Sequence, residues 1–86
     1  MPSYTVQVLI ENKPGISDPE GATILKDLVL KGKYSSVKKI RTGKMIKFQI
    51  NEKTKDIAKK KVKKICDDLR IYNPLVSKIT LEIFEN

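Results

Sequence analysis

The sequence predicts an α+β fold in which two helices pack on one face of a four-stranded antiparallel sheet. Two observations lead to this prediction. Segments in which apolar residues alternate at period two are separated by two segments with apolar residues at helical spacing. Taken along the chain, the order is β-α-β-β-α-β, which is that of the ferredoxin-like arrangement. A chain of 86 residues has room for one hydrophobic core, so we expect a single domain over residues 1–86.

The first strand is expected over residues 4–10, where apolar or aromatic side chains alternate with others. The side chains that share one face of this strand are Tyr4, Val6, Val8 and Ile10. The following run Asn12-Lys13-Pro14-Gly15 ends the strand, because proline lacks a backbone donor and glycine tolerates a turn. The strand is therefore half-buried and short.

The first helix is expected over residues 19–31. Asp18 can accept hydrogen bonds from the free backbone N–H groups of the first turn, and Pro19 suits the first helical position. Gly32 is a natural stop just after the last apolar residue. The apolar stripe of this helix consists of Ile24, Leu25, Leu28 and Val29. Such a stripe has to be covered by another element.

A hairpin of two strands, 37–41 and 45–50, is expected around a turn at residues 42–44. In the second strand every other residue is apolar and would face the core. The first strand does not alternate, because Val37 and Ile40 would point to opposite faces. We therefore expect a bulge or an irregular entry in the first strand.

A second helix is expected over residues 55–70, with Thr54 as its N-cap. Its core-facing seam has the 4-3-4 spacing of a helix and consists of Ala58, Val62, Ile65 and Leu69. Cys66 lies beside this seam and is interpreted as a small core residue rather than a reactive thiol. After Asn73-Pro74, apolar residues at every second position between 75 and 83 predict the closing strand.

The residue inventory argues against catalysis on this chain. There is no histidine, and Cys66 is the single cysteine, so histidine-dependent triads, His-ligated metal sites and paired-cysteine zinc or redox sites are excluded. No glycine-rich phosphate-binding loop is present. No apolar run approaches the roughly 20 residues that a membrane span needs, and the N-terminus does not resemble a signal peptide. We expect a cytoplasmic protein with no membrane contact, no metal and no catalytic residue.

Positive charge is concentrated in the middle of the chain. The formal net charge is +8, and residues 31–64 carry fourteen lysines or arginines against only Glu52 and Asp56. One interpretation is a basic nucleic-acid-binding module formed by residues 31–64. The other is a solvated, lysine-rich surface, and it is favoured because the segment lacks the interleaved aromatic side chains on which bases stack. Nucleic acid is thus an alternative partner and not the first choice.

Two short motifs carry a resemblance to a known family. Residues 13–21 contain Asp18-Pro19-Glu20-Gly21, which looks like a "DPxG" signature between a loop and a helix. Residues 40–44, Ile40-Arg41-Thr42-Gly43-Lys44, look like a "VRxGK" signature, with isoleucine in place of the usual valine. In this order and at this chain length, the two motifs resemble those of the PurS family, the small subunit of phosphoribosylformylglycinamidine synthase.

The resemblance implies a role in purine biosynthesis as a subunit of a glutamine-dependent, ATP-consuming carbon–nitrogen ligase. That enzyme converts formylglycinamide ribonucleotide, glutamine and ATP to the amidine. The resemblance further implies that a glutaminase subunit releases ammonia, that a synthetase subunit binds ATP and magnesium, and that the small subunit joins the two for ammonia transfer. No cofactor is then expected on this chain.

The same resemblance implies candidate residues for contact with partner subunits, namely Asp18, Pro19, Gly21, Arg41, Gly43 and Lys44. Gly21 would allow close backbone approach, Gly43 would supply a positive-φ turn, and Arg41 and Lys44 would be displayed toward carboxylates or phosphate. Local helix capping and an ordinary charged hairpin tip explain the same residues and stay open as alternatives.

A homo-oligomer, at least a dimer, is also expected. A domain of this size buries a small core, and an antiparallel sheet leaves open edges along which another copy can pair.

Overall fold

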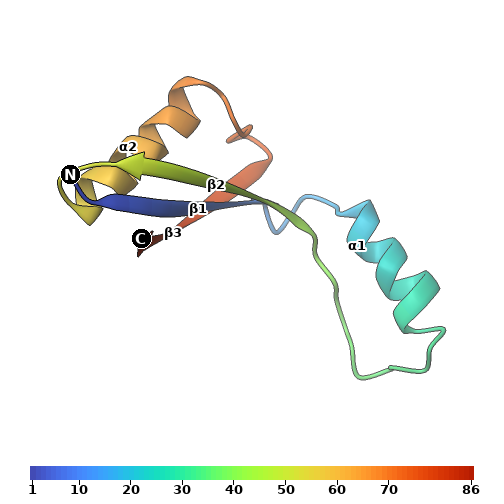
Figure 1. Cartoon of the computed structure of the whole chain (residues 1–86). Helices are drawn as coiled ribbons and strands as arrows, with labels where there is room; N and C mark the ends of the chain where they lie inside the picture. Colours follow the sequence, from blue (N-terminus) through green and yellow to red (C-terminus); the bar gives the residue numbers. More distant parts are fainter.

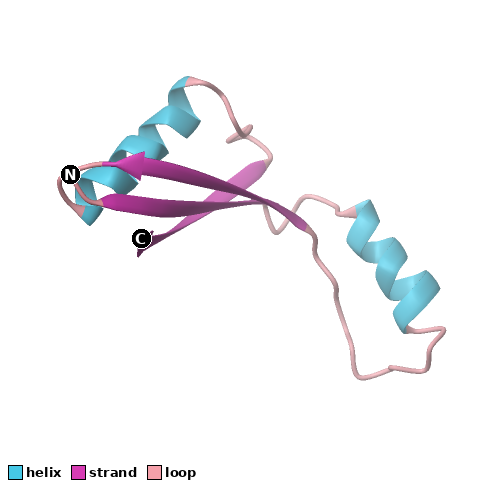
Figure 2. Ribbon diagram, viewed as in Figure 1, coloured by secondary structure: helices cyan, strands magenta, loops and turns pink.

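The computed structural model describes all residues from Met1 to Asn86. Its sheet has three antiparallel strands, β1 (Ser3–Asn12), β2 (Gly43–Asn51) and β3 (Ser77–Glu85), in the order β2-β1-β3 (Figure 1). The helical segments are α1 (Pro19–Thr23), the π-helix η1 (Ile24–Val29) and α2 (Lys55–Asp68) (Figure 2). The α+β class and the antiparallel sheet are confirmed.

The core lies between the sheet and α2. Val6 on the central strand is opposite Phe48 on β2 and Ile83 on β3, so three apolar side chains form one row across the sheet. The fully buried side chains of the core are Val6, Val8, Val62 and Cys66. Cys66 is therefore a core residue, as predicted, and burial raises the pKa of its thiol, which keeps the thiol protonated near neutral pH.

Helix α2 is close to its predicted form. Its N-cap is Thr54, whose hydroxyl oxygen accepts a hydrogen bond from the backbone N–H of Ile57 at 3.2 Å. The helix buries Ala58, Val62 and Cys66 against the sheet. It ends at Asp68 and not at residue 70, and Arg70 reverses the chain with a positive φ of 54°.

The predicted strand over residues 37–41 is absent, and with it the hairpin. Residues 37–42 have no regular structure, and the sheet has three strands instead of four. A consistent apolar face is what a strand needs to be held against a core, and this segment has none. Gly43 does not take the predicted positive φ, since no glycine of the chain does; it is the first residue of β2.

The first helix also differs from the prediction, because it does not share a face with α2. Segments α1 and η1 form one continuous helical stretch over residues 19–29 that extends away from the sheet (Figure 1). In its second half the backbone N–H of Leu30 donates to the carbonyl of Leu25, which is π-type bonding. The residue in the left-handed region after it is Lys33, with φ of 69°, and not Gly32.

These differences make the molecule elongated. We call residues 19–42, which leave the sheet and return to it, the arm (Figure 1). The radius of gyration is 16.5 Å, against about 12 Å for a compact chain of this length. Within the arm Leu28 is 67% exposed, and Ile24, Leu25 and Val29 are only partly buried, so the apolar stripe is incompletely covered by the rest of the chain. No helix is long and apolar enough to cross a membrane.

Candidate functional site

The arm is connected to the sheet at a small joint, formed by residues 12–21, from the end of β1 into α1, and by residues 40–43, which lead into the start of β2. The two sequence motifs meet here, although some twenty residues separate them along the chain. The carboxylate of Asp18, the backbone of Gly21 and the guanidinium of Arg41 hold the two segments together. The joint is therefore the place where the predicted site residues converge.

Asp18 is the centre of the joint. One of its carboxylate oxygens accepts the backbone N–H of Gly21 at 3.0 Å, which caps α1 as predicted. The other accepts the backbone N–H of Thr42 at 2.5 Å, and the hydroxyl of Thr42 lies 2.9 Å from both oxygens. The residue is buried, with 9% of its surface exposed. A single carboxylate thus fixes the start of the arm helix and the entry to β2.

The hydrogen bonds to Asp18 stabilise its ionised form. The backbone N–H of Thr42, and next that of Gly21, lower the pKa of the Asp18 carboxyl below its ordinary value. Because the carboxylate is occupied by donors from its own chain, it is not placed to act as a general base. The carboxylate of Asp18 therefore has a structural role, which is to connect the start of α1 to the segment before β2.

Lowering the pH is expected to loosen the joint. The pKa of Asp18 is lower in the folded chain, so its ionised form contributes fully above the ordinary value of 3.8 and is lost as the pH falls through the lower folded value. NMR spectra recorded from about pH 6 to 2 should show the amide signals of Gly21 and Thr42 moving together. In Asp18→Asn this transition should be missing. Signals that stay unchanged to pH 2 in the native chain would contradict the assignment.

Gly21 lets the helix touch the segment before β2. This residue is buried, and a Cβ atom at position 21 would overlap the backbone carbonyl oxygen of Ile40 and lie 2.9 Å from its carbonyl carbon. Backbone atoms cannot move aside as a side-chain end can. A side chain at position 21 is therefore incompatible with the joint as it stands. Pro19 precedes Gly21 at the first helical position, where no backbone donor is needed.

Arg41 is turned inward and not displayed, in contrast to the expectation from its motif. Its guanidinium donates to the backbone carbonyls of Ile16 at 3.0 Å, Asn12 at 3.1 Å and Lys13 at 3.2 Å. A guanidinium suits this task, because its donors can reach several carbonyls of one loop. Arg41 thereby orders the loop that leads from β1 to the arm.

Gly43 and Lys44 continue from the joint into the sheet. Gly43 lies opposite Glu11 of β1, and a Cβ there would be 3.1 Å from the carbonyl oxygen of Ile10. Close contact with β1, and not a turn, explains this glycine. Lys44 is exposed and has no ion-pair partner within the chain. It is the one residue of the second motif whose charge points to solvent.

Thr42 was missed by sequence reasoning, although it contributes both a backbone and a hydroxyl donor to Asp18. The only signal in the sequence was a short hydroxyl side chain inside the second motif. Its partner lies 24 positions earlier, and no local pattern pairs residues over that distance.

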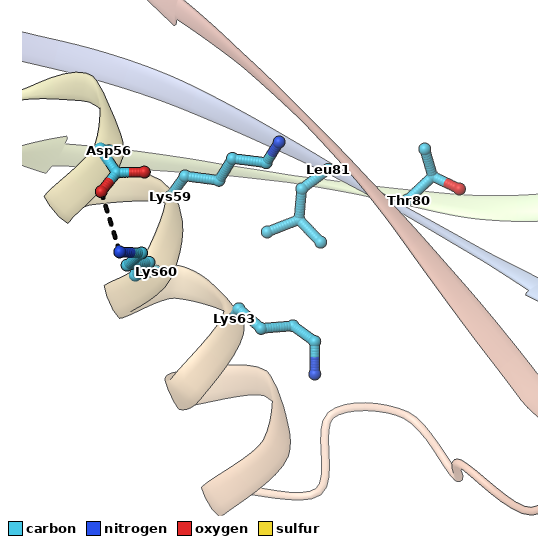
Figure 3. A pocket seen from close by; sticks show the side chains of 6 residues that line it. All are labelled: Asp56, Lys59, Lys60, Lys63, Thr80 and Leu81. Carbon is cyan, nitrogen blue, oxygen red and sulfur yellow. Dashed lines mark ion pairs between the residues drawn. The ribbon is translucent and has the colours of Figure 1, made fainter.

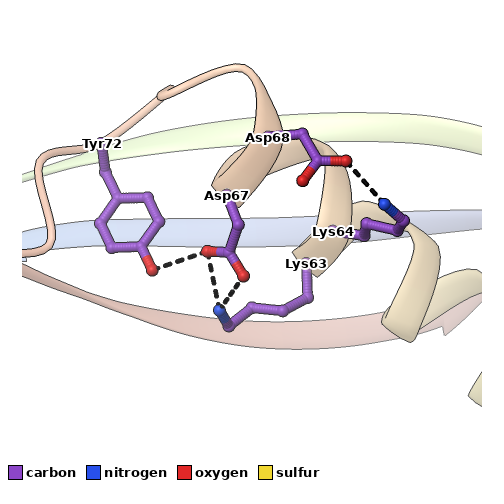
Figure 4. A network of polar contacts seen from close by, with 5 residues as sticks. All are labelled: Lys63, Lys64, Asp67, Asp68 and Tyr72. Carbon is purple, nitrogen blue, oxygen red and sulfur yellow. Dashed lines mark hydrogen bonds and ion pairs between the residues drawn. The ribbon is translucent and has the colours of Figure 1, made fainter.

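The lysine side chains of α2 form a solvated face, as the sequence favoured. Four of its lysines form ion pairs, among them Lys63 with Asp67 and Lys64 with Asp68, and Asp67 also accepts from the hydroxyl of Tyr72 (Figure 4). The hydrogen bond from Lys63, and next that from Tyr72, lower the pKa of Asp67. The remaining basic residues of 31–64 lie largely on the arm and β2, so the basic residues are spread over several elements of the chain.

The side chains offer no cluster for a metal, because no three histidine, cysteine, aspartate or glutamate residues come together. What the joint can do chemically is limited to holding the arm in one orientation. A projecting arm with an incompletely covered apolar stripe is a feature suited to contact with another protein.

Comparison with known proteins gives one consistent result. The family model for PurS, described as phosphoribosylformylglycinamidine (FGAM) synthase, matches residues 5–85. Over 74 residues the chain is 35% identical to the PurS subunit of this synthase from Archaeoglobus fulgidus. The aligned residues make up 86% of this chain and 90% of the relative.

Solved structures agree. The crystal structure of PurS from Methanocaldococcus jannaschii superposes with a TM-score of 0.82 at 31% identity, over 96% of this chain and 98% of the other. A chain in the structure of PurLQS from Thermotoga maritima superposes with a TM-score of 0.78 at 30% identity, over the full length of both chains.

Proposed function

The chain belongs to the PurS family, the small subunit of FGAM synthase in purine biosynthesis, and from this premise we propose that it acts as a bridging subunit. In this role it joins the glutaminase and synthetase subunits so that ammonia released by one reaches the other. The relative from Thermotoga maritima was solved as part of PurLQS, which supports an assembly with further subunits. The reaction served is the conversion of formylglycinamide ribonucleotide, glutamine and ATP to the amidine.

The observation that carries the proposal is the arm, whose helix contacts no other helix or strand of its own chain. A helix with an apolar stripe is stable only when that stripe is covered, because isolated helices of this length are marginal in water. The joint holds the arm in a defined direction, and the partner then has to supply the covering surface. Bridging is useful because ammonia is mostly protonated at neutral pH and loses its nucleophilicity if it equilibrates with water.

We propose that the first partner of the arm is a second copy of the chain. Helix α2 lies mainly over β1 and β3, and on the same face Ile46, Phe48 and Ile50 of β2 stay partly exposed beside it. The arm helix of another copy fits this position. The assembled protein would then have two helices on one face of each sheet, which is the ferredoxin-like layering that the single chain lacks.

We further propose that the chain supplies no catalytic residue and binds no cofactor, with ATP and magnesium held by the synthetase subunit, and that it works in the cytoplasm. The inventory without histidine and with a buried, protonated Cys66 supports the first part. The nucleic-acid alternative for residues 31–64 is not favoured, because the lysines of α2 are largely paired with acidic side chains.

Reconstitution tests the bridging role. The chain is mixed with the glutaminase and synthetase subunits of the same organism, and amidine formation is followed with glutamine or with ammonium salt as the nitrogen source. Glutamine-dependent turnover should require the chain, whereas ammonium-dependent turnover by the synthetase should not. Full glutamine-dependent turnover without the chain would refute the proposal.

We propose that most of the candidate interface residues act by orienting the arm, namely Asp18, Pro19, Gly21, Arg41 and Gly43. Lys44 acts by direct contact with a partner carboxylate. Lys44→Ala is expected to weaken association about two- to fivefold, as is usual for an exposed ion pair. The effect should fade with added salt. Lys47→Ala, an exposed lysine on the same strand, is the matched control. Equal dissociation constants for the two variants would exclude Lys44 from the interface.

A further inference from the structure

Strand β3 forms one edge of the sheet and pairs only with β1. Its hydrogen-bonding pattern follows from the two ends of the ladder. The N–H of Asn86 donates to the carbonyl of Ser3 at 2.9 Å, and the N–H of Lys13 donates to the carbonyl of Val76 at 2.9 Å. In an antiparallel ladder every second residue bonds to the same neighbour. The even-numbered residues of β3 therefore face β1.

The backbone groups of Ile79, Leu81 and Ile83 consequently point away from the sheet. Their side chains lie toward α2 and are partly buried, whereas their N–H and C=O groups form an unpaired row along the outer edge. An extended segment of another polypeptide can continue the sheet at such a row.

A groove of about 600 Å³ runs along this edge, between β3 and α2 (Figure 3). Thr80 and Leu81, whose side chains point to opposite faces of the sheet, both line it, so it follows the edge of the strand and not one face. The remaining lining residues are Asp56, Lys59, Lys60 and Lys63. The groove has an aliphatic floor, made by Leu81 and the lysine stems, and a positively charged rim.

The charges of the rim are not fully balanced. Lys60 is paired with Asp56 at 3.0 Å, and Lys63 with Asp67 at 2.6 Å. Lys59 has no ion-pair partner within the chain, and its side chain extends over the groove toward the sheet (Figure 3). Asp56 and Asp67 each balance one of the three lysines that line the groove, so its unpaired positive charge is that of Lys59.

We propose that this groove binds an extended acidic segment of a partner protein, which adds to the edge of β3 as a fourth strand. Main-chain hydrogen bonds to Ile79, Leu81 and Ile83 hold the segment, and carboxylates on alternate residues meet Lys59 and Lys63.

The spacing of the two lysines matches such a ligand. Residues four apart on a helix rise about 6 Å along its axis. Side chains on the same face of a strand repeat every two residues, or about 6.6 to 6.8 Å. Consecutive acidic side chains of the bound strand can therefore reach Lys59 and Lys63 in turn. Sheet extension provides affinity that is independent of sequence, and the lysines provide the selection for acidic segments.

Charge complementarity favours an acidic partner over a second copy of this chain. The chain carries a net charge of +8, and two β3 edges paired antiparallel would bring two lysine-rich α2 helices toward each other. Binding at β3 and α2 is independent of the bridging role of the arm.

The test uses the full chain, labelled with ¹⁵N, and a capped seven-residue peptide in which threonine and glutamate alternate. The amide signals of Ile79, Leu81 and Ile83 are expected to shift, and their hydrogen exchange is expected to slow at least about tenfold at saturation. A peptide with lysine in place of glutamate should not bind. No binding, equal binding of both peptides, or shifts confined to the β2 edge would overturn the proposal.

Variants localise the charge effect. Lys59→Gln with Lys63→Gln is expected to weaken binding about tenfold, and Lys59→Gln alone, which breaks no ion pair, about threefold. Lys38→Gln with Lys39→Gln removes the same charge from exposed positions on the arm and should change the affinity less than twofold. If the outer amides of β3 are already protected without peptide, and protection rises with protein concentration, a second copy occupies the edge and the proposal fails.

Discussion

Replacing Gly21 with alanine is expected to destabilise the joint by about 1–3 kcal/mol, the usual cost of forcing an extra group into a packed site. The new methyl group would overlap the carbonyl oxygen of Ile40, so the helix and the segment before β2 have to separate. The amide of Thr42, which donates to Asp18 in the native joint, should then exchange with solvent about 5- to 150-fold faster.

The same variant should lower glutamine-dependent amidine formation in the reconstituted enzyme, because the arm would no longer point in one direction. The three strands and α2 do not contact Gly21, so the circular dichroism of the sheet and of α2 should persist. Gly15→Ala is the matched control, since a Cβ at position 15 meets nothing within 4 Å and Gly15 has no positive φ. Native turnover and native Thr42 exchange in Gly21→Ala would show that the arm does not depend on the joint.

The part of the fold that could be predicted is the part whose stability is local to the chain. Strand β1, the second strand of the expected hairpin and α2 each have an apolar face that the same chain covers, so periodicity locates them within a few residues. Thr54 and Asp18 were identified as helix caps because capping chemistry acts over three residues. These features need no knowledge of distant contacts.

The arm could not be predicted, because an apolar stripe shows only that a helix needs a partner. It does not show whether the partner is the sheet of its own chain or another molecule. The turn predicted at Gly43 was wrong for a related reason. A turn favours glycine, and so does close contact with a backbone carbonyl such as that of Ile10, so the residue type does not distinguish the two. Each of the two motifs of the joint could be recognised in the sequence. The hydrogen bonds of Thr42 to Asp18 and of Arg41 to Ile16 could not, because they join residues that are distant along the chain.

Leu28→Asp is expected to convert the proposed dimer into a monomer. Leu28 is 67% exposed in the single chain, so its loss should barely change the fold of the monomer. In a dimer whose arm stripes are covered by the opposite sheets, each Leu28 contributes about 1.5–3 kcal/mol. A symmetric interface contains the residue twice, so the combined effect of about 3–6 kcal/mol raises the dissociation constant at least a hundredfold.

Sedimentation equilibrium at micromolar concentration measures this effect, with 9.8 kDa as the mass of the monomer. Leu75→Asp introduces the same change at a residue that is 80% exposed and lies outside the arm, and it should leave the dimer intact. A native chain that sediments as a monomer would remove the proposed self-association, and a dimer that survives in Leu28→Asp would place its interface elsewhere. Loss of the dimer together with loss of glutamine-dependent turnover would show that bridging requires two copies, because the apolar stripe of the arm is then covered only by the opposite sheet.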